Sequence, residues 1–158
     1  MSICVHGLKL PFCTQPDLNI GWKYHAMNIT GKCYCGEIRY EAEIDVNMVG
    51  ICHCTDCQKL SGSAFRTIVI TEDNKFQLIA GGLKSYVKIA ESGTKRTQTF
   101  CPTCGSPIYS SSESSPEYSI RVGTIDQRSQ LVPKFQLWHR SAQPWMPSIS
   151  GTEVKELQ

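Results

Sequence analysis

Seven of the nine cysteines stand in three short clusters. They are Cys33-x-Cys35, Cys52-x-Cys54-x-x-Cys57 and Cys101-x-x-Cys104. Thiolates at such spacing bind zinc, which takes four tetrahedral ligands in structural sites and commonly draws them from two close cysteine pairs. Metal binding is therefore the first chemistry that the sequence predicts.

The two close pairs together predict a closed structural site of four thiolates. Each pair is followed at once by a glycine, Gly36 or Gly105, and glycine tolerates the positive φ that the chain often needs after it has wrapped a metal. Such a site joins segments that are far apart in the sequence, so we expect the metal to contribute directly to folding. The alternative for these four residues is buried free thiols or disulfides.

The triplet predicts a different kind of site, because no fourth cysteine stands near it. Three protein ligands and an open position are the arrangement of catalytic zinc. Cys57 also falls in the first turn of a helix that Thr55 is expected to cap, where free amides stabilise a thiolate. Two alternatives are a closed site completed by His139 and a redox or metal-free cluster. His53 is a poor fourth ligand, because it is wedged between two adjacent ligands.

Composition limits the classes of protein that fit. The chain has 158 residues, enough for one domain, and Lys+Arg 16 against Asp+Glu 14 leaves a charge of +2 without a basic block, which argues against nucleic-acid binding. The first residues carry no secretion signal and no stretch is apolar enough to span a membrane, so we expect a cytoplasmic protein whose thiols stay reduced. Cys4 and Cys13 are then ordinary free thiols. Seven thiolates and two Zn²⁺ ions add three negative charges, which takes the formal charge to about −1.

The elements that must position the cysteines are mostly short strands, which predicts a mostly antiparallel β domain with few short helices. The expected strands are Glu37–Ile44, Ala64–Thr71, Phe76–Ala80, Ser85–Ala90, Lys95–Phe100, Ile108–Ser110, Tyr118–Val122 and Phe135–Trp138. One helix is expected from about Thr55 and another, of about one turn, over Thr124–Arg128. We divide the chain into an N-terminal extension (1–28), a zinc-binding domain (29–150) and a C-terminal tail (151–158).

The motifs, taken together, resemble those of the glutathione-dependent formaldehyde-activating enzyme family, which shares its domain with centromere protein V. They are Gly31-Lys-Cys33-x-Cys35-Gly36-x-Ile38-x-Tyr40, Cys52-His53-Cys54-x-x-Cys57-Gln58-x-x-Ser61-Gly62-Ser63-x-Phe65, Phe100-Cys101-x-x-Cys104-Gly105, Gly123-Thr124-Ile125-Asp126 and His139-Arg-Ser-x-x-Pro144-Trp145. The resemblance covers residues 30 to 146. The departures are mild, with Ile125 where leucine is more usual and Trp138 before His139.

The resemblance implies an Mss4-like fold with two Zn²⁺ ions, one structural and one catalytic. The four cysteines of the pairs would be structural and the triplet catalytic. It also implies carbon–sulfur lyase chemistry, in which glutathione and formaldehyde form S-hydroxymethylglutathione and the reverse. Three thiolates on Zn²⁺ carry a net charge of −1, so this zinc suits holding a substrate thiol better than generating hydroxide. A possible homo-oligomer is compatible with the sequence.

Substrate contacts are expected from residues around the triplet. They are Gln58, Ser63, Phe65 and His139. We expect the charges of Lys59, Arg66 and Arg128 to be solvated surface charges, although each could meet a substrate carboxylate. For His139 the alternatives are a proton relay, a fourth metal ligand and a core histidine, and the core position is favoured. We expect Asp126 to be a helix cap or turn residue, and Trp138 and Trp145 to lie in the core or a pocket wall.

Two other classes of function compete with the enzyme. One is a binding module in which both metals are structural, although such a module has no reason to leave a ligand position open. The other is a thiol oxidoreductase, since methionine sulfoxide reductases of the B type share the Mss4-like architecture. That class is less favoured, because every cysteine outside the N-terminal extension is already assigned to metal.

Overall fold

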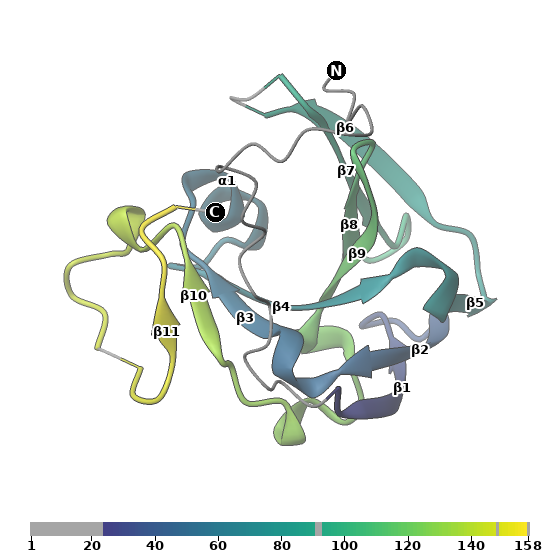
Figure 1. The fold of residues 1–158 in the computed structure, drawn as a ribbon. Coiled ribbons are helices and arrows are strands. Elements are labelled where there is room, and N and C mark those ends of the chain that lie inside the picture. Colours follow the sequence, from purple (N-terminus) through teal and green to yellow (C-terminus); the bar gives the residue numbers. More distant parts are fainter. Residues whose placement is uncertain (1–23, 91–92, 148, 158) are drawn as a thin grey trace, which may run out of the picture.

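The computed structural model describes residues 24–90, 93–147 and 149–157. Over these residues the protein is mostly β, with two sheets that lie against each other (Figure 1). The smaller sheet has three antiparallel strands in the order β1-β2-β5. Their bounds are Ala26–Lys32, Arg39–Asp45 and Phe76–Ala80. The prediction of a mostly β fold with few short helices is confirmed.

The larger sheet has eight strands in the order β11-β10-β3-β4-β9-β8-β7-β6. In chain order they are β3 (Val49–Cys52), β4 (Arg66–Glu72), β6 (Lys84–Ile89), β7 (Lys95–Phe100), β8 (Pro107–Ser112), β9 (Ser115–Arg121), β10 (Phe135–Leu137) and β11 (Glu153–Val154). The pairs from β3 to β6 across the sheet are antiparallel. At the other end β10 runs parallel to both β3 and β11, so the expected antiparallel order does not extend over the whole sheet.

One α-helix stands among the described residues. It is α1 (Thr55–Ser61), which lies inside the curve of the larger sheet (Figure 1). The five 3-10 turns are η1 (Val46–Met48), η2 (Asp73–Lys75), η3 (Val122–Thr124), η4 (Arg128–Gln130) and η5 (His139–Ser141). The helix predicted over Thr124–Arg128 is wrong, because the chain forms η3 and η4 there and Ile125, between them, is extended.

The main core lies between the two sheets. Every second residue along β2, starting from the residue just before it, is buried, as the alternation with charged residues predicts. These residues are Ile38, Tyr40, Ala42 and Ile44. Their side chains pack with those of Val69 and other residues of the larger sheet. This packing fixes β1 and β2 against the larger sheet, and thereby fixes the loop between them, which carries the first cysteine pair.

Most predicted strands agree with the structure to within a few residues, but three strands were not predicted. β3 has four residues, all buried, so it shows no alternation of apolar and polar residues. β1 begins at Ala26, inside the segment assigned to the N-terminal extension, and β11 lies in the segment assigned to the tail. Both sheets therefore use residues beyond 29–150.

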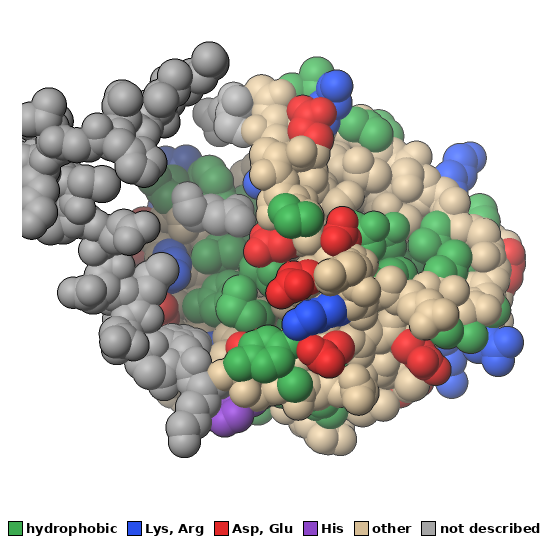
Figure 2. All heavy atoms as spheres, turned by 45° about the vertical axis from the view of Figure 1, so that its right-hand side comes forward, with side chains coloured by type: hydrophobic (Ala, Val, Ile, Leu, Met, Phe, Trp, Pro, Cys, Tyr) green, Lys and Arg blue, Asp and Glu red, His purple; other side chains and the backbone are tan. Residues whose placement is uncertain are grey.

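The described helices include none that is long and apolar enough to cross a membrane. On the face drawn in Figure 2, acidic and basic side chains are interspersed among hydrophobic and neutral ones. Lys75, for example, forms ion pairs with Glu43 and Glu72.

Candidate metal centres

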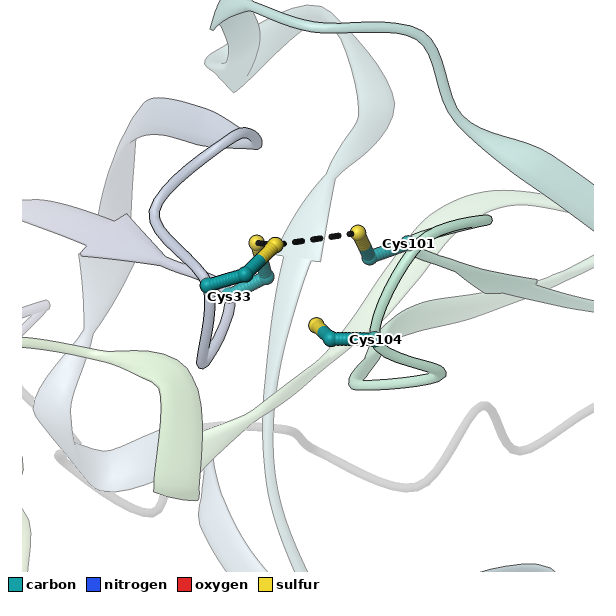
Figure 3. A group of neighbouring side chains, drawn as sticks. Cys33, Cys101 and Cys104 are labelled. Carbon is teal, nitrogen blue, oxygen red and sulfur yellow. Dashed lines mark hydrogen bonds between the residues drawn. The ribbon is translucent and has the colours of Figure 1, made fainter.

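Cys33, Cys35, Cys101 and Cys104 form one group, with all four sulfur atoms within 4.8 Å of one another. The loop between β1 and β2 supplies the first pair, and the turn between β7 and β8 supplies the second. In Figure 3, Cys33 points toward Cys101 and Cys104 across the gap between these two loops. The structure thus brings together the two pairs that the sequence predicts as one site.

The two loops have similar backbone geometry. The amide of Cys33 donates to the carbonyl of Ile38 (3.1 Å), and the amide of Cys101 donates to that of Ser106 (3.0 Å), five residues on in each case. Gly36 and Gly105 follow the second cysteine of their pairs with φ of 80° and 72°. The expected positive φ is confirmed at both glycines, and it turns each chain so that both of its sulfur atoms face the other loop.

The spacing of the sulfur atoms fits a tetrahedral zinc ion. Sulfur atoms on such an ion lie about 3.8 Å apart. The sulfur of Cys35 lies 3.4 Å from that of Cys33 and 3.8 Å from that of Cys101. Hydrogen bonding from Ser106 lowers the pKa of Cys104 to about 5, which favours the thiolate that a metal requires. The four residues therefore fit a closed metal site.

Cys52, Cys54 and Cys57 form the second group, whose sulfur atoms also lie within 4.8 Å of one another. Cys52 ends β3 and Cys57 lies in the first turn of α1. The helix is capped by Cys54, not by Thr55 as expected, because the sulfur of Cys54 accepts from the amide of Cys57 (3.3 Å). The sulfur contacts from Cys52 and Cys57 lower the pKa of Cys54, so this group readily holds a thiolate.

No histidine, carboxylate or further cysteine joins the triplet within the part of the chain that the structure describes. His53 is fully buried, and its Nε2 donates to Oε1 of Gln136 (2.9 Å). His139 packs edge-on against His53 and has 39% of its side chain exposed, so the expected core position is wrong. Among described residues the triplet therefore offers three ligands to a metal.

The wall beside the triplet contains two buried arginines. Arg66 is the direct partner of Cys52 across the β3–β4 pair and is only 5% exposed, so the expected solvated position is wrong. Arg121, at the end of β9, is 6% exposed. Burial and the charge of Arg66 lower the pKa of Arg121 to about 9 and the cysteine charges raise it, so it remains a cation at neutral pH.

Arg121 and the residue that holds it were missed by sequence reasoning. Gln98 on β7 accepts with its Oε1 from both Arg66 (3.2 Å) and Arg121 (3.0 Å). The alternation of β9 carried a signal, because Tyr118 and Ile120 face the main core and Ser119 and Arg121 must face the other way. The β7–β9 pairings that bring Gln98 to the same face could not be read from the sequence.

Gln58, predicted as a substrate contact, is occupied by protein partners. Its Nε2 donates to the carbonyls of His53 (2.7 Å) and Ser141 (2.8 Å), and its Oε1 accepts from Gln143 (2.9 Å). These bonds tie α1 to the segments on either side of it. Ser63, at the other end of α1, is exposed, and Phe65 packs edge-on against His53.

The remaining predicted residues are dispersed. Lys59 and Arg128 are exposed, as expected. Arg128 lines a depression of about 330 Å³ that also includes Cys33, so it lies at the four-cysteine group. Asp126 accepts from the Thr30 hydroxyl (2.8 Å) at a turn, and Trp145 is 71% exposed rather than in a core or wall.

Trp138 lies beside the cysteine triplet, which agrees with one of its two predicted positions, a pocket wall. It packs in an apolar group that also includes the three cysteines of the triplet. The other members of this group are Ile70, Phe135 and Leu137. Trp138 has a positive φ of 57°, the single non-glycine residue with this conformation among those described. The triplet is thus walled by apolar side chains on one side and by two cations on another.

Comparison with known proteins gives a family and a fold. Residues 28–141 match the family model described as glutathione-dependent formaldehyde-activating enzyme. Among solved structures, the crystal structure of a Rhodobacter sphaeroides protein, a structural genomics target, is similar with a TM-score of 0.51 and 22% sequence identity. The likeness covers 63% of this chain and 88% of that one, and at this identity it supports the fold alone.

Proposed function

Since this chain belongs to the glutathione-dependent formaldehyde-activating enzyme family, we propose that it is a zinc-dependent carbon–sulfur lyase that interconverts glutathione plus formaldehyde with S-hydroxymethylglutathione. The observation that carries the proposal is the difference between the two cysteine groups. One offers four thiols that surround a single point, and the other offers three and lacks a fourth ligand among the described residues.

In this proposal the four-cysteine group is structural. It joins the β1–β2 loop to the β7–β8 turn, and Cys35 and Cys101 stand 66 residues apart in the sequence. A metal at this position closes a long loop and leaves no position for a substrate. Cys33 and Cys101 are buried, whereas Cys104 is half-buried and Cys35 is exposed, so the site stands at the edge of the core.

The triplet is the catalytic group. A zinc ion bound by Cys52, Cys54 and Cys57 would supply an open position that holds a thiol and lowers its pKa. The residues of the chain prepare this position. The amide of Cys57 fixes the sulfur of Cys54, and the apolar side chains of Phe135 and Trp138 pack beside the triplet, where a lower local dielectric strengthens electrostatic interactions.

The proposed reaction needs the open metal position and cationic groups beside it. The sulfur of glutathione adds to the carbonyl carbon of formaldehyde, a C–S bond forms, and the thiol proton ends on the former carbonyl oxygen. The reverse reaction breaks the same bond. Cationic groups near the reacting atoms stabilise the negative charge that is transferred from sulfur to oxygen. Arg66 and Arg121 are the buried cations of this wall.

The test is turnover of S-hydroxymethylglutathione, followed by exchange NMR at equilibrium, together with zinc content per chain. We expect the wild-type protein to bind two zinc ions and to accelerate the exchange. Cys54→Ser should retain one zinc ion and lose the acceleration. A wild-type protein with two zinc ions and no acceleration would instead support a binding module in which both metals are structural.

A further inference from the structure

The two buried arginines beside the cysteine triplet bear on which ligand the triplet binds, in addition to the charge stabilisation proposed for the reaction. Arg66 lies opposite Cys52, and Arg121 lies opposite Ile68, the next residue on the same face of β4. Residues two apart on a strand share a face, so both guanidinium groups stand on the face that carries Cys52. Both are about nineteen-twentieths buried.

Neither arginine is neutralised by an acid. The ion pairs of residues 24–90, 93–147 and 149–157 include neither Arg66 nor Arg121. Both guanidinium groups instead donate to one neutral acceptor, Oε1 of Gln98, and the Nε of each is buried without a partner among these residues. Burying a cation without a counter-charge costs desolvation free energy. Two guanidinium groups that share one amide oxygen therefore require negative charge nearby.

The cysteine triplet supplies negative charge beside these arginines, since Arg66 lies opposite Cys52 and Arg121 interacts electrostatically with all three cysteines. Two other cations on the same face, Lys88 and Arg96, compensate this negative charge less. Lys88 on β6 reaches across to α1 and forms an ion pair with Asp56, so its charge is compensated. Arg96, two residues before Gln98, is only half-buried and keeps part of its hydration. Of these four cations, Arg66 and Arg121 therefore have the strongest electrostatic interaction with the triplet.

The charges of the group do not balance until a further anion is present. Three thiolates and one Zn²⁺ carry −1, and the two arginines bring the buried group to +1. A fourth ligand with a single negative charge makes the group neutral, whereas a neutral ligand leaves an uncompensated buried cation. Because the group is buried, the difference in free energy between binding an anionic and a neutral ligand is larger than it would be at the surface.

We propose that Arg66 and Arg121, held together by Gln98, are positioning residues that make the open position of the triplet select an anionic ligand, a thiolate, over a neutral one. The proposal rests on the proposed function, because it assumes a metal on the triplet. Beyond that function, it explains the ligand specificity of the open metal position. This specificity comes from the two buried arginines and not from the three cysteine ligands.

The experiment uses the full chain loaded with Co²⁺, whose visible absorption reports ligands at an open position. Thiocyanate serves as the anionic probe and imidazole as the neutral probe. We expect Arg66→Met and Arg121→Met to weaken thiocyanate binding about tenfold or more and to change imidazole binding by less than about twofold. Arg66→Lys and Arg121→Lys should bind thiocyanate nearly as the wild type does, since they keep the charge. Arg96→Met is the matched control and should leave both affinities unchanged.

Gln98→Glu is the decisive variant, because it keeps both arginines and nearly the same shape. Its carboxylate cancels one positive charge and gives both guanidinium groups a stronger acceptor. We therefore expect it to weaken thiocyanate binding about as much as Arg121→Met does, with no loss of thermal stability. If the arginines served packing alone, Gln98→Glu would leave thiocyanate binding unchanged.

The possible failures are distinct. Equal weakening of both probes by the methionine variants, or lysine variants that behave like methionine variants, would overturn the selection by charge and leave the proposed function standing. A wild-type protein that binds one Co²⁺ per chain and gives no spectral response to either probe would overturn the proposed function, and this inference with it.

Discussion

Cys52 and Arg66 lie directly opposite one another across the antiparallel pair of β3 and β4. Residues opposite each other in such a pair have side chains on the same face, so this register places a buried guanidinium beside a member of the cysteine triplet. A shift of one residue would turn Arg66 to the other face, toward the main core. The chemistry of the triplet therefore depends on the register of a strand with four residues.

The four-cysteine group should determine whether the protein folds. Cys101→Ser removes a ligand that is fully buried between the two sheets. We expect this variant to lose one metal ion per chain and to aggregate or unfold without cooperativity, because the metal closes loops of more than 60 residues and Cys35 and Cys101 are 66 apart. Metal content by atomic absorption and unfolding by circular dichroism check this. A soluble variant with cooperative unfolding would contradict a structural role.

The triplet should contribute less to folding than the four-cysteine group. Its neighbouring ligands are two or three positions apart in the sequence, so the metal closes only short loops. On the loop-closure estimate it therefore stabilises the fold by about 2–3 kcal/mol less than the metal of the four-cysteine group. We expect Cys54→Ser to lose one metal ion and to unfold cooperatively with a smaller change in stability than Cys101→Ser. The comparison uses urea unfolding of both variants in the same buffer. The assignment is wrong if Cys54→Ser is the more severe of the two.

Gln58 should act through the position of α1. Gln58→Leu leaves the carbonyls of His53 and Ser141 without their donor, which costs about 1–3 kcal/mol. It also frees the helix that carries Cys57, so we expect weaker metal binding at the triplet and an unchanged four-cysteine site. Competition with a chelator measures both. Lys59→Ala, an exposed change on the same helix, is the control; if it weakens the triplet equally, the tie through Gln58 is not the cause.

Gly50 on β3 should not accept a side chain. A Cβ at this position would lie 2.1 Å from a ring carbon of Phe135, a member of the apolar group around the triplet. We expect Gly50→Ala to lower the free energy of unfolding by about 1–3 kcal/mol, since the ring must move. Gly123→Ala is the control, because nothing lies within 4 Å of its Cβ. Equal stability of the two variants by urea unfolding would argue against a close contact of β3 and β10.

Tyr40 should make stability fall at alkaline pH. Burial raises the pKa of its hydroxyl to about 12, whereas an unfolded tyrosine titrates at about 10. The stabilisation is complete below pH 10 and is lost as pH rises through 12, because the unfolded chain releases its proton first. Tyr40→Phe lacks the hydrogen bond to Thr124 (2.8 Å), so we expect it to be about 1 kcal/mol less stable at pH 7.

The difference between wild type and Tyr40→Phe should shrink above pH 10 and reverse toward pH 12. Urea unfolding at a series of pH values, with the absorbance of tyrosinate recorded alongside, measures this. A difference that stays constant over the whole series would show that Tyr40 titrates normally.

The cysteine spacing alone determined a large part of this protein. Ligands within a few residues of each other are positioned by local geometry, so the two pairs, the triplet and the glycines at positive φ could be read directly. The alternation along β2 was equally informative, because a strand with one buried face repeats every two residues. Both signals are local.

The tertiary structure alone decided what surrounds the triplet. Arg66 was expected to be a surface charge, and Arg121 was not singled out in the sequence. Both are buried because β3, β4, β9 and β7 place them and Gln98 on one face. Strand order and register depend on contacts between residues far apart in the chain, which no local pattern encodes. The sequence therefore determined which thiols can bind a metal, and the pairing of distant strands decided which charges those thiols face.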